Sequence, residues 1–468
     1  MTFLGCFTIL AACSNSDDAE KPVAPIPTGD VTIYSTTNSL TRDLTRDAVN
    51  FSLKDNLAPT SITLNPTEQY QTMDGFGVAI TGATCFNLLQ MKPEDRHAFL
   101  TETFSDDKGF GFSYIRISIG CSDFSLSEYT CCDKKGIENF ALQSEEKEYI
   151  LPILKEILDI NPSIKIIAAP WTCPTWMKVK SLTDLTPFES WTNGQLNPAY
   201  YQDYATYFVK WVQAFNAEGI DIYAVTPQNE PLNRGNSASL YMSWEEQRDF
   251  VKTALGPKFK TAGLATKIYA YDHNYDYSDI ETEKNYPGKM YEDPAASQYL
   301  AGAAYHNYGG NREELLNMHK AYPEKELLFT ETSIGTWNSG RDLSKRLLED
   351  MKEVALGTIN NWCKGVIVWN LMLDNDRAPN REGGCQTCYG AVDISNSDYK
   401  TIIRNSHYYI IAHLSSVVKP GALRIGATGY ADSNIMYSAF ENPDGTYAFV
   451  LMNNNEKTKR ITFSDGKR

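Results

Sequence analysis

One repeating pattern limits the folds open to this chain. Between residues 71 and 415, a short apolar run is followed by a loop rich in Gly, Pro and Asn, and then by a stretch with helical spacing. Apolar runs of this length are typical of strands buried on both faces of a sheet. Eight runs fit: Met73–Ile80, Phe112–Ile119, Ile164–Trp171, Ile222–Thr226, Lys267–Tyr271, Ala301–Tyr305, Glu326–Thr330 and Gly365–Asn370. Eight buried strands alternating with helices predict an α/β chain whose residues 71–415 form a (β/α)8 TIM barrel.

The segments between the runs have the spacing of amphipathic helices. Residues 198–218 and 341–357 show it, and Pro93 fits the first turn of another helix. The clearest case is residues 146–160, which place five apolar side chains on one stripe: Ile150, Ile153, Leu154, Ile157 and Leu158. The competing fold, a doubly wound open sheet, usually shows a Gly-rich phosphate loop after its first strand. Asp74–Gly77 does not match that loop.

Short strand-like segments flank the barrel on both sides. Ser61–Leu64, within residues 31–70, alternates and is bounded by prolines. After residue 415, strands are predicted at Leu423–Ile425, Ile435–Ser438, Tyr447–Met452 and Arg460–Phe463, with a strong turn at Asn442–Gly445. We expect residues 416–468 to form a β-sandwich that the strands of residues 31–70 complete. No closing strand is predicted after Phe463, which leaves a truncated sandwich as an open alternative.

The N-terminus has the features of an export signal. Residues 1–12 resemble the apolar core of a signal peptide, and Leu10–Cys13 resembles a bacterial lipobox with Cys13 as the lipidated residue. Residues 13–30 are polar and Pro-rich, as in a flexible tether. No Lys or Arg precedes the apolar stretch, so an accidental apolar N-terminus is the alternative. We expect an outer-membrane, cell-surface or periplasmic protein that contacts membrane only through a lipid anchor at Cys13, since no run reaches the ~18 apolar residues of a span.

Charge and cysteine content restrict the partners. The chain has 43 Lys and Arg against 58 Asp and Glu, a net charge of −15, which argues against nucleic acid and favours a neutral substrate. Export permits disulfides among the ten Cys. Cys385 and Cys388 form a C-x-x-C without a second such motif or paired His, so zinc is disfavoured and a local disulfide or free thiols remain. The neighbouring Cys131 and Cys132 are equally open.

Two glutamates stand where such a barrel carries its chemistry. Catalytic groups lie at the carboxyl ends of the strands. Glu230 follows the fourth predicted strand in the sequence TPQNEP, and Glu331 follows the seventh in FTETS. Taken singly, Asn-Glu-Pro is an ordinary turn and Thr-Glu-Thr an ordinary strand end. Their joint placement at two strand ends favours a site with two carboxyl groups.

Two carboxyl groups at one site match the needs of acetal cleavage. One carboxylic acid protonates the leaving oxygen while a carboxylate attacks the anomeric carbon, and carboxyl groups about 5–5.5 Å apart retain the configuration. We expect Glu230 to be the protonated acid/base and Glu331 the ionised nucleophile, with pKa values split by their environments. Asn229 is placed to bind the sugar 2-hydroxyl. No metal and no organic cofactor is expected, because this reaction needs only two carboxyl groups and water.

Several ordered motifs resemble a known family. They run from about Met73 to the C-terminus and comprise Asp74–Gly77, Tyr114–Arg116, Ser122–Phe124, Pro170–Lys178, Gln228–Pro231, Tyr305–Tyr308, Thr330–Glu331 and Val368–Leu371. Together they resemble glycoside hydrolase family thirty, which contains glucosylceramidases, endo-β-1,6-glucanases and some xylanases. The resemblance implies a (β/α)8 barrel fused to a β-sandwich, and hydrolysis with retention of configuration.

The resemblance also implies roles for individual residues. Glu230 would be the acid/base and Glu331 the nucleophile. The remaining side chains would form the sugar site: Trp171 and Asn229 as binding groups, Trp369 as the floor of the first subsite, and Arg116, His306 and Tyr308 as lining groups that orient the carboxylates. Structural alternatives exist for three of them, since Arg116 fits a buried ion pair, Trp369 a barrel core and His306 a hydrogen-bonded core histidine.

The substrate depends on finer features. Glucosylceramidases typically carry Thr-Asp after the first strand, where this chain has Thr81-Gly82. Loss of a charged acceptor costs about 1.5–3 kcal/mol of binding, which argues against an exo-type pocket. Residues 81–85 look closer to the β-1,6-glucanase branch. We therefore expect an endo-β-1,6-glucanase, with a glucosylceramidase-type exo-β-glucosidase and a catalytically silent glycan-binding lipoprotein as alternatives. The sequence does not indicate an oligomeric state.

Overall fold

The computed structural model describes residues 27–52 and 59–466. The predicted apolar leader and Cys13, the predicted lipidation site, lie outside these residues. Among the helices within the described ranges, none combines the length and the hydropathy that a bilayer span requires.

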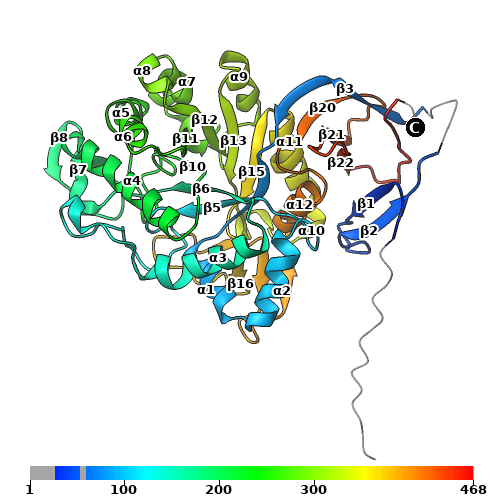
Figure 1. Ribbon diagram of the computed structural model, residues 1–468, viewed down its shortest axis with the longest axis horizontal. Coiled ribbons are helices and arrows are strands. Elements are labelled where there is room, and N and C mark those ends of the chain that lie inside the picture. Colours follow the sequence, from blue (N-terminus) through cyan, green and yellow to red (C-terminus); the bar gives the residue numbers. More distant parts are fainter. Residues whose placement is uncertain (1–26, 53–58, 467–468) are drawn as a thin grey trace, which may run out of the picture.

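Eight parallel strands close into a barrel, which confirms the fold predicted from the alternating pattern (Figure 1). Following the chain, the strands are Gly75–Ala79 (β4), Tyr114–Ser118 (β5), Lys165–Ala169 (β6), Ala224–Val225 (β10), Lys267–Asn274 (β11), Leu300–His306 (β12), Glu326–Glu331 (β13) and Cys363–Val368 (β15). Neighbours in the chain are neighbours in the barrel, and β15 closes it against β4. All eight predicted runs are strands, but β11 continues three residues past its predicted end at Tyr271.

Helices connect successive strands and surround the barrel (Figure 1). They are Gly82–Gln90 (α1), Pro93–Phe104 (α2), Leu151–Ile160 (α3), Tyr201–Ala217 (α4), Trp244–Phe250 (α5), Gly256–Thr261 (α6), Tyr286–Tyr291 (α7), Pro294–Ser297 (α8), Glu313–Ala321 (α9), Leu343–Asp350 (α10), Leu356–Asn360 (α11) and Ser406–Ser415 (α12). The turns Glu146–Ile150 (η2), Val251–Leu255 (η5) and Met351–Ala355 (η9) are continuous with α3, α5 and α10. The three predicted helical stretches are confirmed, and Pro93 begins α2 as expected.

Side chains fill the barrel interior, so the mouth rests on a packed floor. Tyr114 of β5 is fully buried there, and Gly365 of β15 makes space for it: a Cβ at Gly365 would lie 2.9 Å from Tyr114 Cε1. The interior cluster contains Tyr114, Ile167, Ala224, Tyr269, Ala304, Leu328 and Ile367. A filled interior confines ligand binding to the ends of the barrel.

A smaller sheet domain lies beside the barrel (Figure 1). Its five strands, in spatial order, are Tyr447–Asn453 (β22), Ile435–Glu441 (β21), Leu423–Gly429 (β20), Ser61–Thr72 (β3) and Thr462–Ser464 (β23). The strand predicted at Ser61 is therefore part of the C-terminal sheet, where β3 pairs antiparallel with β20. The other N-terminal strands, Val31–Ser35 (β1) and Thr45–Val49 (β2), pair with each other.

Short strands decorate the loops around the barrel. They form three small sheets: Lys178–Ser181 (β7), Asp184–Pro187 (β8) and Gln195–Leu196 (β9); Ile334–Gly335 (β14) and Cys388–Tyr389 (β17); Met372–Asp374 (β16), Val392–Ile394 (β18) and Ile402–Arg404 (β19). A disulfide joins Cys385 to Cys388 and settles one open alternative. Cys131 and Cys132 are free buried thiols.

Candidate active site

The two predicted catalytic glutamates face one another at the barrel mouth. Glu230 follows β10 and Glu331 ends β13, and both side chains are almost completely buried. One carboxylate oxygen of each lies within 4.8 Å of the other and of a ring nitrogen of His306. Inverting enzymes separate their carboxyl groups by roughly 6.5–9.5 Å to admit a water. The shorter separation here is that of a retaining pair.

The backbone around Glu230 is held in an uncommon conformation. Its φ of +44° lies in the left-handed region, which costs a residue with a side chain about 1–3 kcal/mol. Two hydrogen bonds stabilise the turn: the Glu230 N–H donates to the Asp272 carbonyl at 2.9 Å, and the Asn229 N–H donates to the Pro170 carbonyl at 2.8 Å. The Asn233 amide donates to Glu230 Oε2 at 2.7 Å. Strain of this kind indicates a position that the surrounding structure fixes for function.

Arg116, which extends from β5, links the groups of the mouth. Its buried guanidinium donates to Glu331 Oε2 at 2.5 Å, to Asn229 Oδ1 at 2.7 Å and to Asp272 Oδ2 at 2.8 Å. The same group lies 5.0 Å from the ring centroid of Trp171 and 5.3 Å from that of Trp369. Both predictions for Arg116 therefore apply: it forms a buried ion pair, and it orients the carboxylate of Glu331.

Asp272 at the end of β11 is a site residue that the sequence analysis missed. It is fully buried and accepts hydrogen bonds from Arg116, from His306 at 3.0 Å, from Thr226 at 2.7 Å and from Thr330 at 2.6 Å. The Arg116 charge and these bonds hold the pKa of its carboxyl far below the usual range, although burial opposes them. The sequence did contain a signal for Asp272. This residue directly follows the fifth predicted strand, Lys267–Tyr271, and catalytic groups of a barrel lie at strand ends.

Two histidines stand against Glu230. His306 Nδ1 lies 3.4 Å from Glu230 Oε1, and His273 Nε2 lies 3.9 Å from the same oxygen. Burial opposes a charge on His306, but the Glu331 charge and the hydrogen bonds to Asp272 and Glu230 raise its pKa to about 9. Burial lowers the pKa of His273 to about 4. At neutral pH the site therefore contains one positively charged histidine, His306.

The two glutamates differ in pKa, in the direction opposite to the sequence-based expectation. Burial raises the pKa of Glu230, but three effects outweigh it and lower the pKa to about 2: the charge that His273 carries below about pH 4, the charge of His306, and hydrogen bonds to the carboxylate. The pKa of Glu331 is raised by burial and by the Glu230 charge, against the opposing charges of His306 and Arg116. The higher pKa of the pair therefore belongs to Glu331. The sequence did not reveal that two histidines from neighbouring strands face Glu230.

Aromatic rings form the wall of the mouth. Trp171 and Trp369 are buried and stacked, with centroids 5.2 Å apart and an interplanar angle of 25°. The Tyr308 hydroxyl donates to Glu331 Oε1 at 3.0 Å and lies 3.2 Å from Ser333 Oγ, while its ring is exposed. The structure therefore brings together all eight residues predicted for the site: Arg116, Trp171, Asn229, Glu230, His306, Tyr308, Glu331 and Trp369.

Asp123, in the loop after β5, is a second missed residue. Its Oδ1 is buried and has no hydrogen-bond partner within the described part of the chain. Burial, together with the charges of Glu331 and Glu230, raises its pKa to about 8. A buried polar atom without a partner is costly, so Oδ1 is suited to bind a ligand hydroxyl. Asp123 belongs to a motif of the family resemblance, but the sequence alone assigned it no role.

Gly82, which underlies the prediction against an exo-type pocket, lies beside a buried carboxyl group. Gly82 lies in the first turn of α1 against Glu145, and a Cβ at this position would come within 1.9 Å of Glu145 Oε1. Thr81 caps the helix and donates its hydroxyl to Asn370 Oδ1 at 2.7 Å. The carboxyl group of Glu145 therefore occupies the space that a side chain at position 82 would need.

The only grouping of potential metal ligands among the described residues is Glu230, His306 and Glu331. Arg116 donates to Glu331, and His306 is positively charged at neutral pH beside Glu230. Each catalytic carboxylate therefore already has a cationic neighbour. These charges oppose a bound cation and favour a site that transfers protons.

This chain is similar to known proteins both in sequence and in fold. Residues 73–418 match the sequence model of the glycosyl hydrolase family 30 TIM-barrel domain, and residues 421–468 match that of the family 30 beta sandwich domain. The crystal structure described as the endo-beta1,6-glucanase BT3312 is 86% identical, with a TM-score of 0.93, over 94% of this chain and 96% of that chain.

More distant relatives carry two different names. Endo-1,6-beta-D-glucanase BGN16.3 of Trichoderma harzianum is 32% identical over 408 residues, which are 82% of this chain and 78% of that protein. Putative glucosylceramidase 4 of Caenorhabditis elegans is 28% identical over 465 residues, 94% of this chain and 85% of that protein. The family models together cover the barrel and the sheet domain. The chain therefore belongs to glycosyl hydrolase family 30, as the sequence motifs predicted.

Proposed function

We propose that the chain is a retaining endo-β-1,6-glucanase in which Glu331 is the nucleophile and Glu230 the acid/base. The observation that carries the reaction class is the approach of the two carboxylates to within 4.8 Å at the barrel mouth. The substrate is inferred from the 86% identical endo-β-1,6-glucanase and from the fungal 1,6-glucanases that also match.

The first step requires the proton on Glu230. In the structure the lower pKa belongs to Glu230 and the higher to Glu331. The reactive form carries a proton on Glu230 and a negative charge on Glu331. Arg116 stabilises the resulting charge on Glu331 through its 2.5 Å hydrogen bond. Glu331 then attacks the anomeric carbon, and Glu230 protonates the departing oxygen.

The second step reverses the role of Glu230. The ionised carboxylate removes a proton from water, which attacks the glycosyl–Glu331 ester and releases the sugar with its original configuration. The positive charge of His306, 3.4 Å from Glu230 Oε1, favours the ionised form of Glu230 needed at this stage. His306 thus helps Glu230 to alternate between acid and base.

Neighbouring groups position the sugar. Asn229 is fixed by Arg116 and is placed to bind the 2-hydroxyl, a contact that strengthens in the transition state. The Trp171–Trp369 wall offers apolar surface to the sugar ring, and Asp123 Oδ1 offers an acceptor to a hydroxyl. These contacts bind the unit whose anomeric carbon reacts.

The assignment is tested by the products of a β-1,6-glucan such as pustulan. Reducing oligosaccharides are expected, whereas an unchanged polymer refutes the assignment. The second candidate, a glucosylceramidase-type exo-β-glucosidase, is favoured by the 28% identity to putative glucosylceramidases. It predicts glucose from aryl β-glucosides or glucosylceramide and no change in pustulan. A silent glycan-binding protein would bind glucan without cleavage, against which the intact pair of glutamates counts.

We also propose that the protein is exported and anchored by lipid at Cys13, on the basis of the lipobox-like sequence from Leu10 to Cys13. Labelled palmitate should be incorporated into the parent chain and not into a Cys13→Ser variant, and the parent should sediment with membranes. Equal labelling of both chains would refute the anchor.

A further inference from the structure

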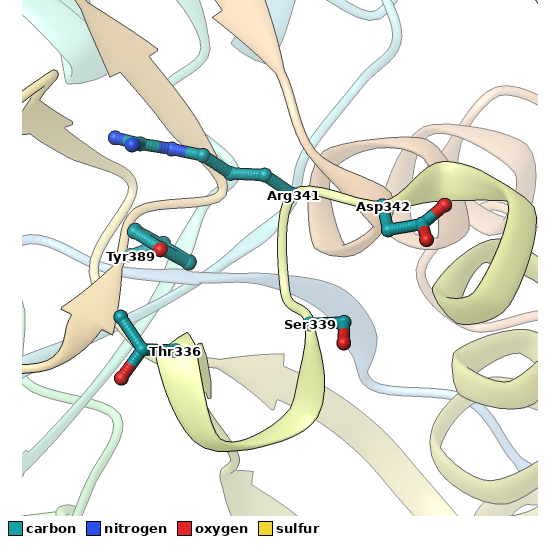
Figure 2. A pocket seen from close by; sticks show the side chains of 5 residues that line it. All are labelled: Thr336, Ser339, Arg341, Asp342 and Tyr389. Atoms are coloured by element: carbon teal, nitrogen blue, oxygen red, sulfur yellow. The ribbon is translucent and has the colours of Figure 1, made fainter.

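A surface pocket of about 390 Å³ opens on the loop that follows the nucleophile. Five residues line it: Thr336, Ser339, Arg341, Asp342 and Tyr389 (Figure 2). Its volume falls within the roughly 300–1,000 Å³ of small-molecule sites. None of these residues contacts the catalytic carboxylates, so the mechanism leaves the pocket without a role.

The pocket is tied to the strand that carries Glu331. Ile334–Gly335 (β14) follows Glu331 after two residues and pairs with Cys388–Tyr389 (β17). The Thr336 N–H donates to the Thr387 carbonyl at 3.0 Å, and the Cys385–Cys388 disulfide closes the loop before Tyr389. The Tyr389 ring is therefore held at a fixed position relative to the nucleophile.

Only a short stretch of chain separates the nucleophile from this pocket. The Tyr308 hydroxyl contacts both Glu331 Oε1 and Ser333 Oγ, and its ring is exposed. Ser333 directly precedes β14, and Trp337 follows β14 in the turn Thr336–Asn338 (η8). Ser333 and β14 are buried, but the rings of Tyr308 and Trp337 are both exposed, and Trp337 follows the nucleophile by six residues in sequence.

Trp337 presents an open aromatic face. Its side chain is 53% exposed, although a buried or partly buried position is usual for so large a ring. The ring lies on the backbone of Gly335, where a Cβ would come within 1.9 Å of Trp337 Cζ3. Glycine at this position thus permits the indole to rest on β14. In the pocket next to it, the Arg341 guanidinium lies 4.2 Å from the Tyr389 ring centroid.

The chemistry of the pocket suits a neutral sugar. A pyranose has an apolar C–H face, which packs on aromatic rings, and a rim of hydroxyls, which bind polar side chains. Trp337 and Tyr389 supply rings, and Thr336 and Ser339 supply hydroxyls. The Arg341 charge is already paired, since its Nε donates to Asp393 Oδ2 at 2.7 Å, so the pocket does not select an anion.

We propose that this pocket and the Trp337 ring form a distal glucan subsite, which binds glucosyl units of the same chain that is cleaved between Glu230 and Glu331. This inference rests on the proposed glucanase function and adds to it a preference for long substrates. Contacts made away from the reacting bond accelerate only the substrates long enough to reach them.

The test compares Trp337→Ala with the parent on β-1,6-linked glucooligosaccharides of increasing length. We expect kcat/KM on the polymer and on long oligosaccharides to fall about tenfold, the scale of one lost ring contact of 1.4 kcal/mol. The value for the shortest oligosaccharide that the parent cleaves should not change, which also shows that the catalytic centre is intact. Tyr447→Ala is the matched control, because Tyr447 is 43% exposed on β22 of the sheet domain. It should match the parent at every length.

Binding provides a second readout without catalysis. In a Glu331→Gln background, Trp337→Ala should weaken the affinity for long oligosaccharides about tenfold and leave that for short ones unchanged. Equal losses at all lengths, or no loss at any length, would overturn the subsite while the parent still cleaves β-1,6-glucan. If the parent itself leaves every β-1,6-glucan intact, the proposed function fails, and the glucan subsite fails with it.

Discussion

The Asp272→Asn substitution should disrupt the hydrogen bonds and the charge balance of the active site, although Asn has nearly the same size and shape as Asp. Asp272 receives four donors on two oxygens: His306 and Thr330 on Oδ1, and Arg116 and Thr226 on Oδ2. Asn has one acceptor oxygen, so its amide NH2 must face one of these two pairs of donors. Either orientation removes the charge that balances Arg116 and His306 and leaves buried donors unsatisfied.

The expected cost follows from these contacts. Removing one partner of a buried ion pair destabilises a protein by about 3–5 kcal/mol, and the Asp272→Asn variant should lose this much free energy of unfolding at pH 7. The pKa of His306 should fall from about 9 toward its ordinary value of 6.5, because the hydrogen bond and charge of Asp272 help to raise it. The alkaline limb of kcat/KM on β-1,6-glucan should then move to lower pH.

Urea unfolding and pH–rate profiles measure the two effects. Asp159→Asn is the control, since Asp159 is exposed on α3 and surface substitutions usually stay within about 0.5 kcal/mol. Two outcomes together would refute the reasoning: an unfolding free energy equal to that of the control, and an alkaline limb at the position found in the parent. A loss of stability with an unchanged limb would show that Asp272 supports the fold without acting on His306.

Three other changes test the remaining groups of the site. Glu230→Ala should slow cleavage of β-1,6-glucan by about 10²–10⁴ and slow an activated aryl glycoside less, since a good leaving group needs little protonation; equal losses would contradict its role as the acid. Asp123→Ala should lower kcat/KM by roughly 2–10-fold at neutral pH, mainly through KM, because its raised pKa leaves the carboxyl mostly neutral and a neutral hydrogen bond contributes about 0.5–1.5 kcal/mol; an unchanged KM would exclude Asp123 from sugar binding. Because the pKa of His306 is raised above 6.5, its contribution to stability should be complete below pH 6.5 and disappear as the pH rises through 9; unfolding curves of the parent and His306→Gln that stay parallel from pH 6 to 10 would contradict this.

The barrel could be read from the sequence because its signals are local. Each buried strand is an apolar run of a few residues, and each helix shows its own periodicity, so the order of elements appears directly in the chain. Glu230 and Glu331 were found for the same reason, since each directly follows such a run. Asp272 escaped because the run before it was ended at Tyr271, where bulge-like irregularities carry β11 further.

Properties that depend on contacts between distant strands could not be predicted. The reversed pKa order of the glutamates arises from His273 and His306, which reach Glu230 from β11 and β12. The surroundings of Gly82 also depend on a distant segment, because Glu145 reaches this position from 63 residues away in sequence. Charge and space at one point in a barrel are set by several loops at once, and no single segment carries that information.

The position of β3 has a consequence for how the chain reaches its folded state. This strand leads within two residues into β4, the first strand of the barrel, yet its partners β20 and β23 come from the last segment of the chain. During synthesis, the twelve residues of β3 must therefore remain without their sheet partners until some 350 further residues have been made. Unpaired strand edges readily join other chains. A chaperone that shields Ser61–Thr72 until β20 arrives should raise the yield of native enzyme more than one that shields any barrel helix.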